Sequence, residues 1–98
     1  MGKYLTLWEV VPGTLPANRK EAGAALLMML EEVKKDIKSG GCKEWGTFLG
    51  QSKGYSIDEA TEVEMMKSTL QTSPYVKYEV IAVASVDQAI QAVKAWIK

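Results

Sequence analysis

The hydrophobic positions of the chain recur with two different spacings, which divide the sequence into predicted strands and helices. Residues 3–11 and 75–84 have mostly apolar, β-branched or aromatic side chains on both alternating sets, which is typical of strands covered on both faces. Residues 42–49 and 54–59 also alternate, and the glycine-containing segment between them predicts a hairpin loop at 50–53. The sequence therefore predicts four strands.

Three other segments have apolar residues at the three- and four-residue spacing of amphipathic helices. The first helix covers residues 15–41 with Asn18 as its N-cap, and the second covers 61–72. The third follows Ser85, the N-cap of the last helix. We expect the apolar stripes to face inward: Ala22, Leu26, Met29, Leu30, Val33 and Ile37 in the first helix, Val63, Met66 and Leu70 in the second, and Val86, Ile90, Val93 and Ile97 in the third.

The predicted order of elements is β-α-β-β-α-β followed by a terminal helix. Two β-α-β halves joined by a hairpin are the ferredoxin-like arrangement, an α+β fold with a four-stranded antiparallel sheet in the order 4-1-3-2. Residues 1–98 are expected to form one domain. Because the helices cover only one face of such a sheet, the other face would expose a large apolar and aromatic patch. We therefore expect a homodimer with the two sheets packed face to face.

Side-chain alternation assigns the strand residues to the two faces, if the hairpin loop has four residues and Phe48 lies opposite Tyr55. The residues expected to face the helices are Leu5, Leu7, Gly46, Phe48, Tyr55, Ile57, Val76, Tyr78, Val80 and Ala82. The residues expected on the helix-free face are Tyr4, Thr6, Trp8, Trp45, Thr47, Ser56, Asp58, Tyr75, Lys77, Glu79 and Ile81.

The helix-free set combines aromatic rings with a few polar groups, which is a composition typical of small-molecule pockets. The predicted ligand-binding residues are Trp8, Trp45, Ser56, Asp58, Tyr75 and Glu79. The alternative is that these residues only pack a dimer interface, because tryptophan and tyrosine are enriched there as well. Asp58 fits equally well as a cap for the second helix. If the protein is an enzyme, Glu79 and Asp58 are the candidate bases.

Charge and composition narrow the function classes. Lysine plus arginine and aspartate plus glutamate both number 12, so we expect neither a nucleic-acid nor a membrane-surface partner. Cys42 is the only cysteine, and histidine is absent, which excludes Ser-His-Asp chemistry and most zinc sites. We predict no metal site and no cofactor. The sequence has no recognisable signal peptide and no run of apolar residues that would span a bilayer, so we expect a cytoplasmic protein.

Three fragments give the chain a resemblance to a known superfamily. They are Tyr4-Leu5-Thr6-Leu7-Trp8, Gly54-Tyr55-Ser56-Ile57 and Tyr78-Glu79-Val80. Together with the order of elements, they resemble the dimeric α+β barrel superfamily, in particular a family of small domains of unknown function. The nearest named relatives of that group are muconolactone-isomerase-like proteins and cofactor-free monooxygenases. The resemblance implies a homodimer whose two sheets enclose a barrel.

Three functions follow as expectations. The first is a homodimer whose barrel holds a small apolar or aromatic molecule. The second is a cofactor-free isomerase or monooxygenase that uses a carboxylate in the barrel as its base. The third is a purely structural or regulatory dimer.

Overall fold

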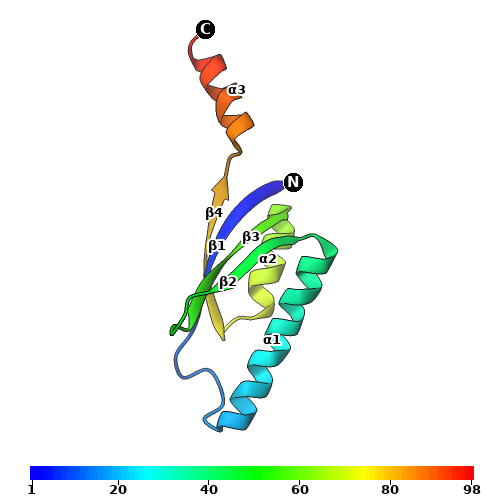
Figure 1. Ribbon diagram of the computed structural model, residues 1–98, viewed down its shortest axis with the longest axis vertical. Helices are drawn as coiled ribbons and strands as arrows, with labels where there is room; N and C mark the ends of the chain where they lie inside the picture. Colours follow the sequence, from blue (N-terminus) through cyan, green and yellow to red (C-terminus); the bar gives the residue numbers. More distant parts are fainter.

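The structure, a computed structural model, describes residues 1–98 and contains four strands and three helices (Figure 1). In chain order these are β1 (Gly2–Val10), α1 (Arg19–Ser39), β2 (Cys42–Thr47), β3 (Lys53–Ala60), α2 (Glu62–Gln71), β4 (Val76–Val83) and α3 (Val86–Trp96). The strands form one antiparallel sheet in the order β2-β3-β1-β4, which is the predicted order read from the opposite edge. The fold is the predicted α+β, ferredoxin-like β-α-β-β-α-β arrangement with an additional C-terminal helix.

The helix ends lie where the capping residues place them. The Asn18 side chain accepts hydrogen bonds from the backbone N–H groups at positions 20 and 21, and Gly40 ends α1 with a φ of 93°, which favours glycine. Thr61 forms a capping box at the start of α2, and Ser85 forms one at the start of α3. No helix is both long enough and apolar enough to cross a membrane.

Helices α1 and α2 lie on one face of the sheet (Figure 1). In three of the four strands, the side chains on that face are not the ones predicted to face the helices. Thr6, Trp8 and Trp45 line a cavity together with residues of α1 and α2, so they point toward the helices. Leu5 and Leu7 alternate with Thr6 and Trp8 along β1 and therefore point to the helix-free face. The prediction for β1, β2 and β3 is inverted, while Val76 and Tyr78 of β4 face the helices as predicted.

Strand pairing explains the error. Trp8 pairs with Tyr78 in β4, and Leu7 pairs with Glu79. Residues directly opposite each other in a ladder share a face, so Leu7 and Tyr78 cannot both face the helices. The prediction assigned the most apolar set of each strand to the helices, but in β1 the leucines are on the helix-free face.

The β2–β3 hairpin differs from its predicted register by two residues. Trp45 lies opposite Ser56, and Thr47 lies opposite Gly54 rather than Ser56. The pairing is interrupted between Cys42 and Glu44 by a bulge, which accommodates one extra residue on β2. Because a shift of two residues preserves the alternation, Trp45, Thr47, Ser56 and Asp58 still share one face, as predicted.

Two helices present their apolar stripes to the outside, contrary to prediction. In α2, Met65 is buried, whereas Val63, Met66 and Leu70 are exposed. Helix α3 extends beyond the end of β4, away from α1 and α2 (Figure 1). Its residues Val86, Ile90, Val93, Trp96 and Ile97 are all exposed.

The helix-free face of the sheet carries a continuous apolar patch. Leu5 lies between Ile57 and Ile81 in the ladder, and Leu7 lies between Tyr55 and Glu79. At the margins of the same face, Lys77 pairs with Glu9 at 3.5 Å and Lys43 with Glu59 at 3.4 Å. An apolar centre with charged margins is the usual composition of a protein–protein interface.

Candidate functional site

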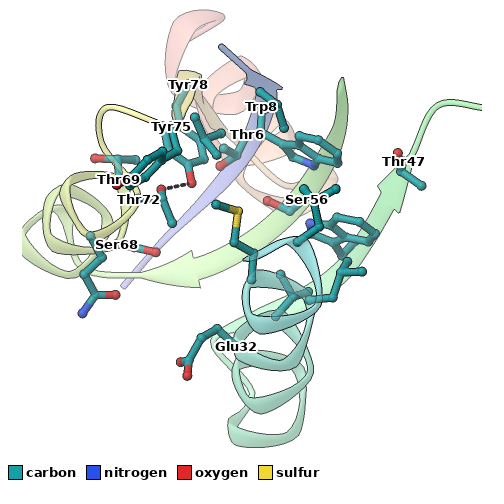
Figure 2. A pocket seen from close by; sticks show the side chains of 18 of the residues that line it. Thr6, Trp8, Glu32, Thr47, Ser56, Ser68, Thr69, Thr72, Tyr75 and Tyr78 are labelled. Carbon is teal, nitrogen blue, oxygen red and sulfur yellow. Dashed lines mark hydrogen bonds between the residues drawn. The ribbon is translucent and has the colours of Figure 1, made fainter. Parts of the chain in front are cut away.

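A cavity of about 1190 Å³ lies between the sheet and helices α1 and α2. Figure 2 labels side chains that line this region from three elements: Thr6, Trp8 and Ser56 from the sheet, Glu32 from α1, and Ser68 and Thr69 from α2. The layer that packs helices against a sheet is therefore partly open, and only five of the 98 residues are buried. Small-molecule sites typically occupy about 300–1,000 Å³, so this cavity is large enough for a ligand of that kind.

Two stacked tryptophans form the aromatic part of the cavity wall. The ring centroids of Trp8 and Trp45 lie 5.2 Å apart with an angle of 9° between the ring planes. Gly54 lies opposite Trp8 in the ladder, and a Cβ atom at position 54 would lie 2.6 Å from Trp8 Cζ2. The absence of a side chain at Gly54 therefore allows the indole to lie flat across β3.

The indole N–H of Trp8 is buried and has no hydrogen-bond acceptor in the protein. Buried polar groups are nearly always paired, and an unpaired one costs about 1–3 kcal/mol. The Trp8 ring thus holds a hydrogen-bond donor at the cavity wall that no protein atom uses.

Asp58 is held at the floor of the cavity by two hydroxyl groups. Thr6 Oγ1 and Ser56 Oγ each donate a hydrogen bond of 2.8 Å to Asp58 Oδ2. Thr6 and Ser56 are themselves buried and face each other across β1 and β3. The second carboxylate oxygen, Oδ1, accepts from neither hydroxyl, and the Cys42 thiol is a further neighbour of the carboxylate. Asp58 is thus a fixed anionic group inside the cavity rather than a cap for α2, whose N-cap is Thr61.

Five of the six predicted ligand-binding residues come together in this cavity: Trp8, Trp45, Ser56, Asp58 and Tyr75. Their location differs from the prediction, because the cavity lies on the helix side of the sheet and not on the helix-free face. Glu79 pairs with Leu7 and lies on the helix-free face, so the prediction that it shares a face with Trp45 is wrong. Lys77 is on that face too, where it pairs with Glu9.

The helices contribute cavity residues that strand alternation does not reveal. Glu32 and Asp36 of α1 line the cavity, as does Tyr78, whose hydroxyl hydrogen-bonds to that of Thr72 at the end of α2 (Figure 2). Glu32 and Asp36 are four residues apart, and this spacing places two side chains on one face of a helix. The spacing is the only signal in the sequence that the two carboxylates lie close together.

Cys42 lies at the cavity wall and is buried, and its thiol donates to the carbonyl of Glu44. Burial, followed by the negative charge of Asp58, raises the pKa of the thiol to about 11. We expect native Cys42 to react with iodoacetamide at least about a hundredfold more slowly than a free thiol near neutral pH, because only the thiolate is nucleophilic. The rate should increase with pH up to about 11 and should become normal in denaturant. Fast labelling of the native protein near neutral pH would contradict this.

A comparison of the chain with protein-family models and with curated proteins finds no match to either.

Proposed function

We propose that this protein binds a small, largely apolar or aromatic molecule in the cavity between its sheet and helices α1 and α2. The observation that carries the proposal is the stacked pair Trp8 and Trp45 in the wall of a 1190 Å³ cavity. Broad aromatic surface together with a few fixed polar groups is the usual composition of a ligand site. Asp58, fixed by Thr6 and Ser56, would orient the polar end of the ligand.

The binding test uses N-phenyl-1-naphthylamine, a neutral aromatic probe whose fluorescence rises in apolar surroundings. Titration is expected to quench tryptophan emission as the probe enters the cavity. Trp45→Ala should weaken binding about tenfold, because stacking on an aromatic side chain contributes about 0.5–1.5 kcal/mol beyond the area buried. The matched control is Trp96→Ala, since Trp96 is exposed on α3 and far from the cavity lining. Equal binding by both variants would contradict the proposed site.

A second candidate function is a cofactor-free enzyme acting on a carbon acid, and one observation favours it. Partial burial, together with the charges of Glu32 and Asp58, raises the pKa of Asp36 and makes it a better proton acceptor. Glu79 is no longer a candidate base for this cavity, because it lies on the other face of the sheet. Asp36→Asn would separate the two functions, since it should abolish proton exchange in a bound carbon acid while leaving binding of a neutral probe intact.

We further propose that the protein is a homodimer, as the resemblance to dimeric α+β barrels implies. One chain exposes 7622 Å², whereas a compact monomer of 10.8 kDa exposes about 5,500 Å². Its radius of gyration is 16.3 Å, against about 13 Å for a compact chain of this length. The surplus of roughly 2,000 Å² per chain, or about 4,000 Å² for two chains, lies within the total of about 2,000–5,000 Å² that the subunits of an obligate dimer bury.

Two exposed apolar surfaces would form the interface. The first is the helix-free face of the sheet, centred on Leu5 and Ile81. The second is the apolar stripe of α3, which includes Ile90 and Val93 and which no other element of the chain covers (Figure 1). In the proposed dimer the two sheets pack face to face, and each α3 packs against the partner subunit.

A further inference from the structure

The charged side chains that line the cavity are all acidic. They include Glu32, Asp36 and Asp58, and no lysine or arginine is among them. The whole chain, in contrast, has 12 basic and 12 acidic residues. A cavity that gathers acidic groups and excludes basic ones has a negative potential, and low-dielectric walls strengthen such a potential.

Neighbouring groups respond to this potential. Partial burial and then the charges of Glu32 and Asp58 raise the pKa of Asp36, and Asp58 also contributes to raising the pKa of Cys42. The pKa of Tyr78 is raised by burial and by Asp58, although its hydrogen bond with Thr72 acts in the opposite direction. Groups on α1, β2 and β4 thus all experience the negative charge of Asp58. Glu32 is paired with Lys35 at 3.1 Å, whereas Asp36 and Asp58 have no basic partner within salt-bridge distance.

The same cavity contains four aromatic rings, from Trp8, Trp45, Tyr75 and Tyr78. The faces of aromatic rings attract organic cations, and an ammonium group over a tryptophan face gains about 0.5–2 kcal/mol depending on its exposure to water. The aromatic surface therefore favours the same sign of ligand charge as the carboxylates do.

We propose, on the basis of the binding function above, that the preferred ligands of this cavity are small organic cations, namely aromatic or alkyl ammonium compounds. A metal ion fits the arrangement less well, because the chain has no group of three or more acidic or cysteine side chains close enough to hold one. Glu32 and Asp36 come from α1 and Asp58 from β3, so the negative charge is distributed around a wide space. Distributed charge with aromatic walls suits a bulky cation with a diffuse charge.

The test compares three probes of similar shape and different charge by tryptophan quenching: phenyltrimethylammonium, its neutral isostere tert-butylbenzene, and the anion benzenesulfonate. We expect the cation to bind at least about tenfold more tightly than the neutral probe, and the anion not to bind. Added salt should weaken binding of the cation alone.

Three variants locate the effect. Asp58→Asn should weaken binding of the cation about tenfold, and Asp36→Asn should weaken it while leaving binding of the neutral probe unchanged. Glu32→Gln should have a smaller effect on the cation, because Lys35 already pairs with Glu32. Asp36 and Glu32 are exposed on α1, so their variants remain informative if Asp58→Asn impairs folding. Glu31→Gln is the matched control, because Glu31 is an exposed carboxylate of the same helix that does not line the cavity.

The outcomes separate this inference from the proposed function. Equal binding of the neutral probe and the cation would overturn the charge preference and leave the binding function standing. Binding of neither would overturn both. A preference for the cation that persists in all three cavity variants would also overturn the inference, because the attraction would then arise elsewhere on the protein.

Discussion

Light scattering at micromolar concentration is expected to give a particle of twice the 10.8 kDa chain mass. Leu5→Arg should convert this particle into a monomer. Leu5 lies between Ile57 and Ile81 on the helix-free face, so an arginine there would have only apolar residues directly opposite it in the ladder. An unpaired charge buried in an interface costs about 3–5 kcal/mol, which raises the dissociation constant by more than about a hundredfold.

A second substitution tests the role of α3 in the dimer. Ile90 lies in the middle of the exposed apolar stripe of α3, so Ile90→Arg should also dissociate the dimer. Leu27→Arg is the control, because Leu27 is equally apolar and exposed but lies on α1, away from both surfaces. A monomeric wild-type protein would refute the dimer. Dissociation by Leu5→Arg but not by Ile90→Arg would refute only the contribution of α3.

Gly54→Ala is expected to destabilise the fold by about 3 kcal/mol or more, through overpacking against backbone that cannot move away. The added Cβ would lie 2.8 Å from Thr47 Cα and 2.6 Å from Trp8 Cζ2, and it would collide with the carbonyl oxygen of Gly46. The substitution pushes β2 away from β3 and tilts the Trp8 ring. We therefore expect a lower denaturation midpoint together with weaker binding of the aromatic probe.

The matched substitution is Gly23→Ala, which should have the opposite sign. Gly23 lies within α1, and nothing approaches within 4 Å of the position where its Cβ would be. Replacing glycine by alanine inside a helix stabilises it by about 0.5–1 kcal/mol. Urea denaturation of the two variants side by side provides the measurement. A Gly54→Ala protein as stable as the wild type would show that the β2–β3 pairing is looser than described.

The features that the sequence predicted correctly are local ones. Asn18, Gly40 and Thr61 set helix ends through contacts within one turn, so a short stretch of sequence contains all the necessary information. The order of strands and helices followed from such signals, and the antiparallel sheet followed from the ferredoxin-like pattern.

The assignment of faces required information that no single segment holds. Alternation divides the residues of β1 into two sets, one on each face of the sheet. Only the pairing of Trp8 with Tyr78 in β4 and with Gly54 in β3 determines which residues of those strands share a face with Trp8. The expectation that the most apolar set faces the helices fails here. The helix side of β1 borders a cavity and carries Thr6 and Trp8, while Leu5 and Leu7 are on the opposite face.

The same reasoning explains the mixed outcome for the candidate site. Trp45, Ser56 and Asp58 were grouped correctly because they lie in one hairpin, where a register error of two residues does not change the face. Glu79 was grouped wrongly because its position depended on pairing with β1, a distant segment. Asp36 was missed because its relation to Asp58 arises from the packing of α1 over the sheet.

The cavity between the helices and the sheet also links ligand occupancy to thermal stability. A molecule that binds only the folded chain raises its free energy of unfolding, by about 2.7 kcal/mol at a hundred times the dissociation constant. For a domain of this size that corresponds to an increase in melting temperature of roughly 10–20 °C. Melting curves recorded with a library of small molecules should therefore identify ligands whatever their chemical class. A molecule bound in the cavity contacts Met65, Trp8 and Trp45 and so buries apolar surface that is open in the free protein.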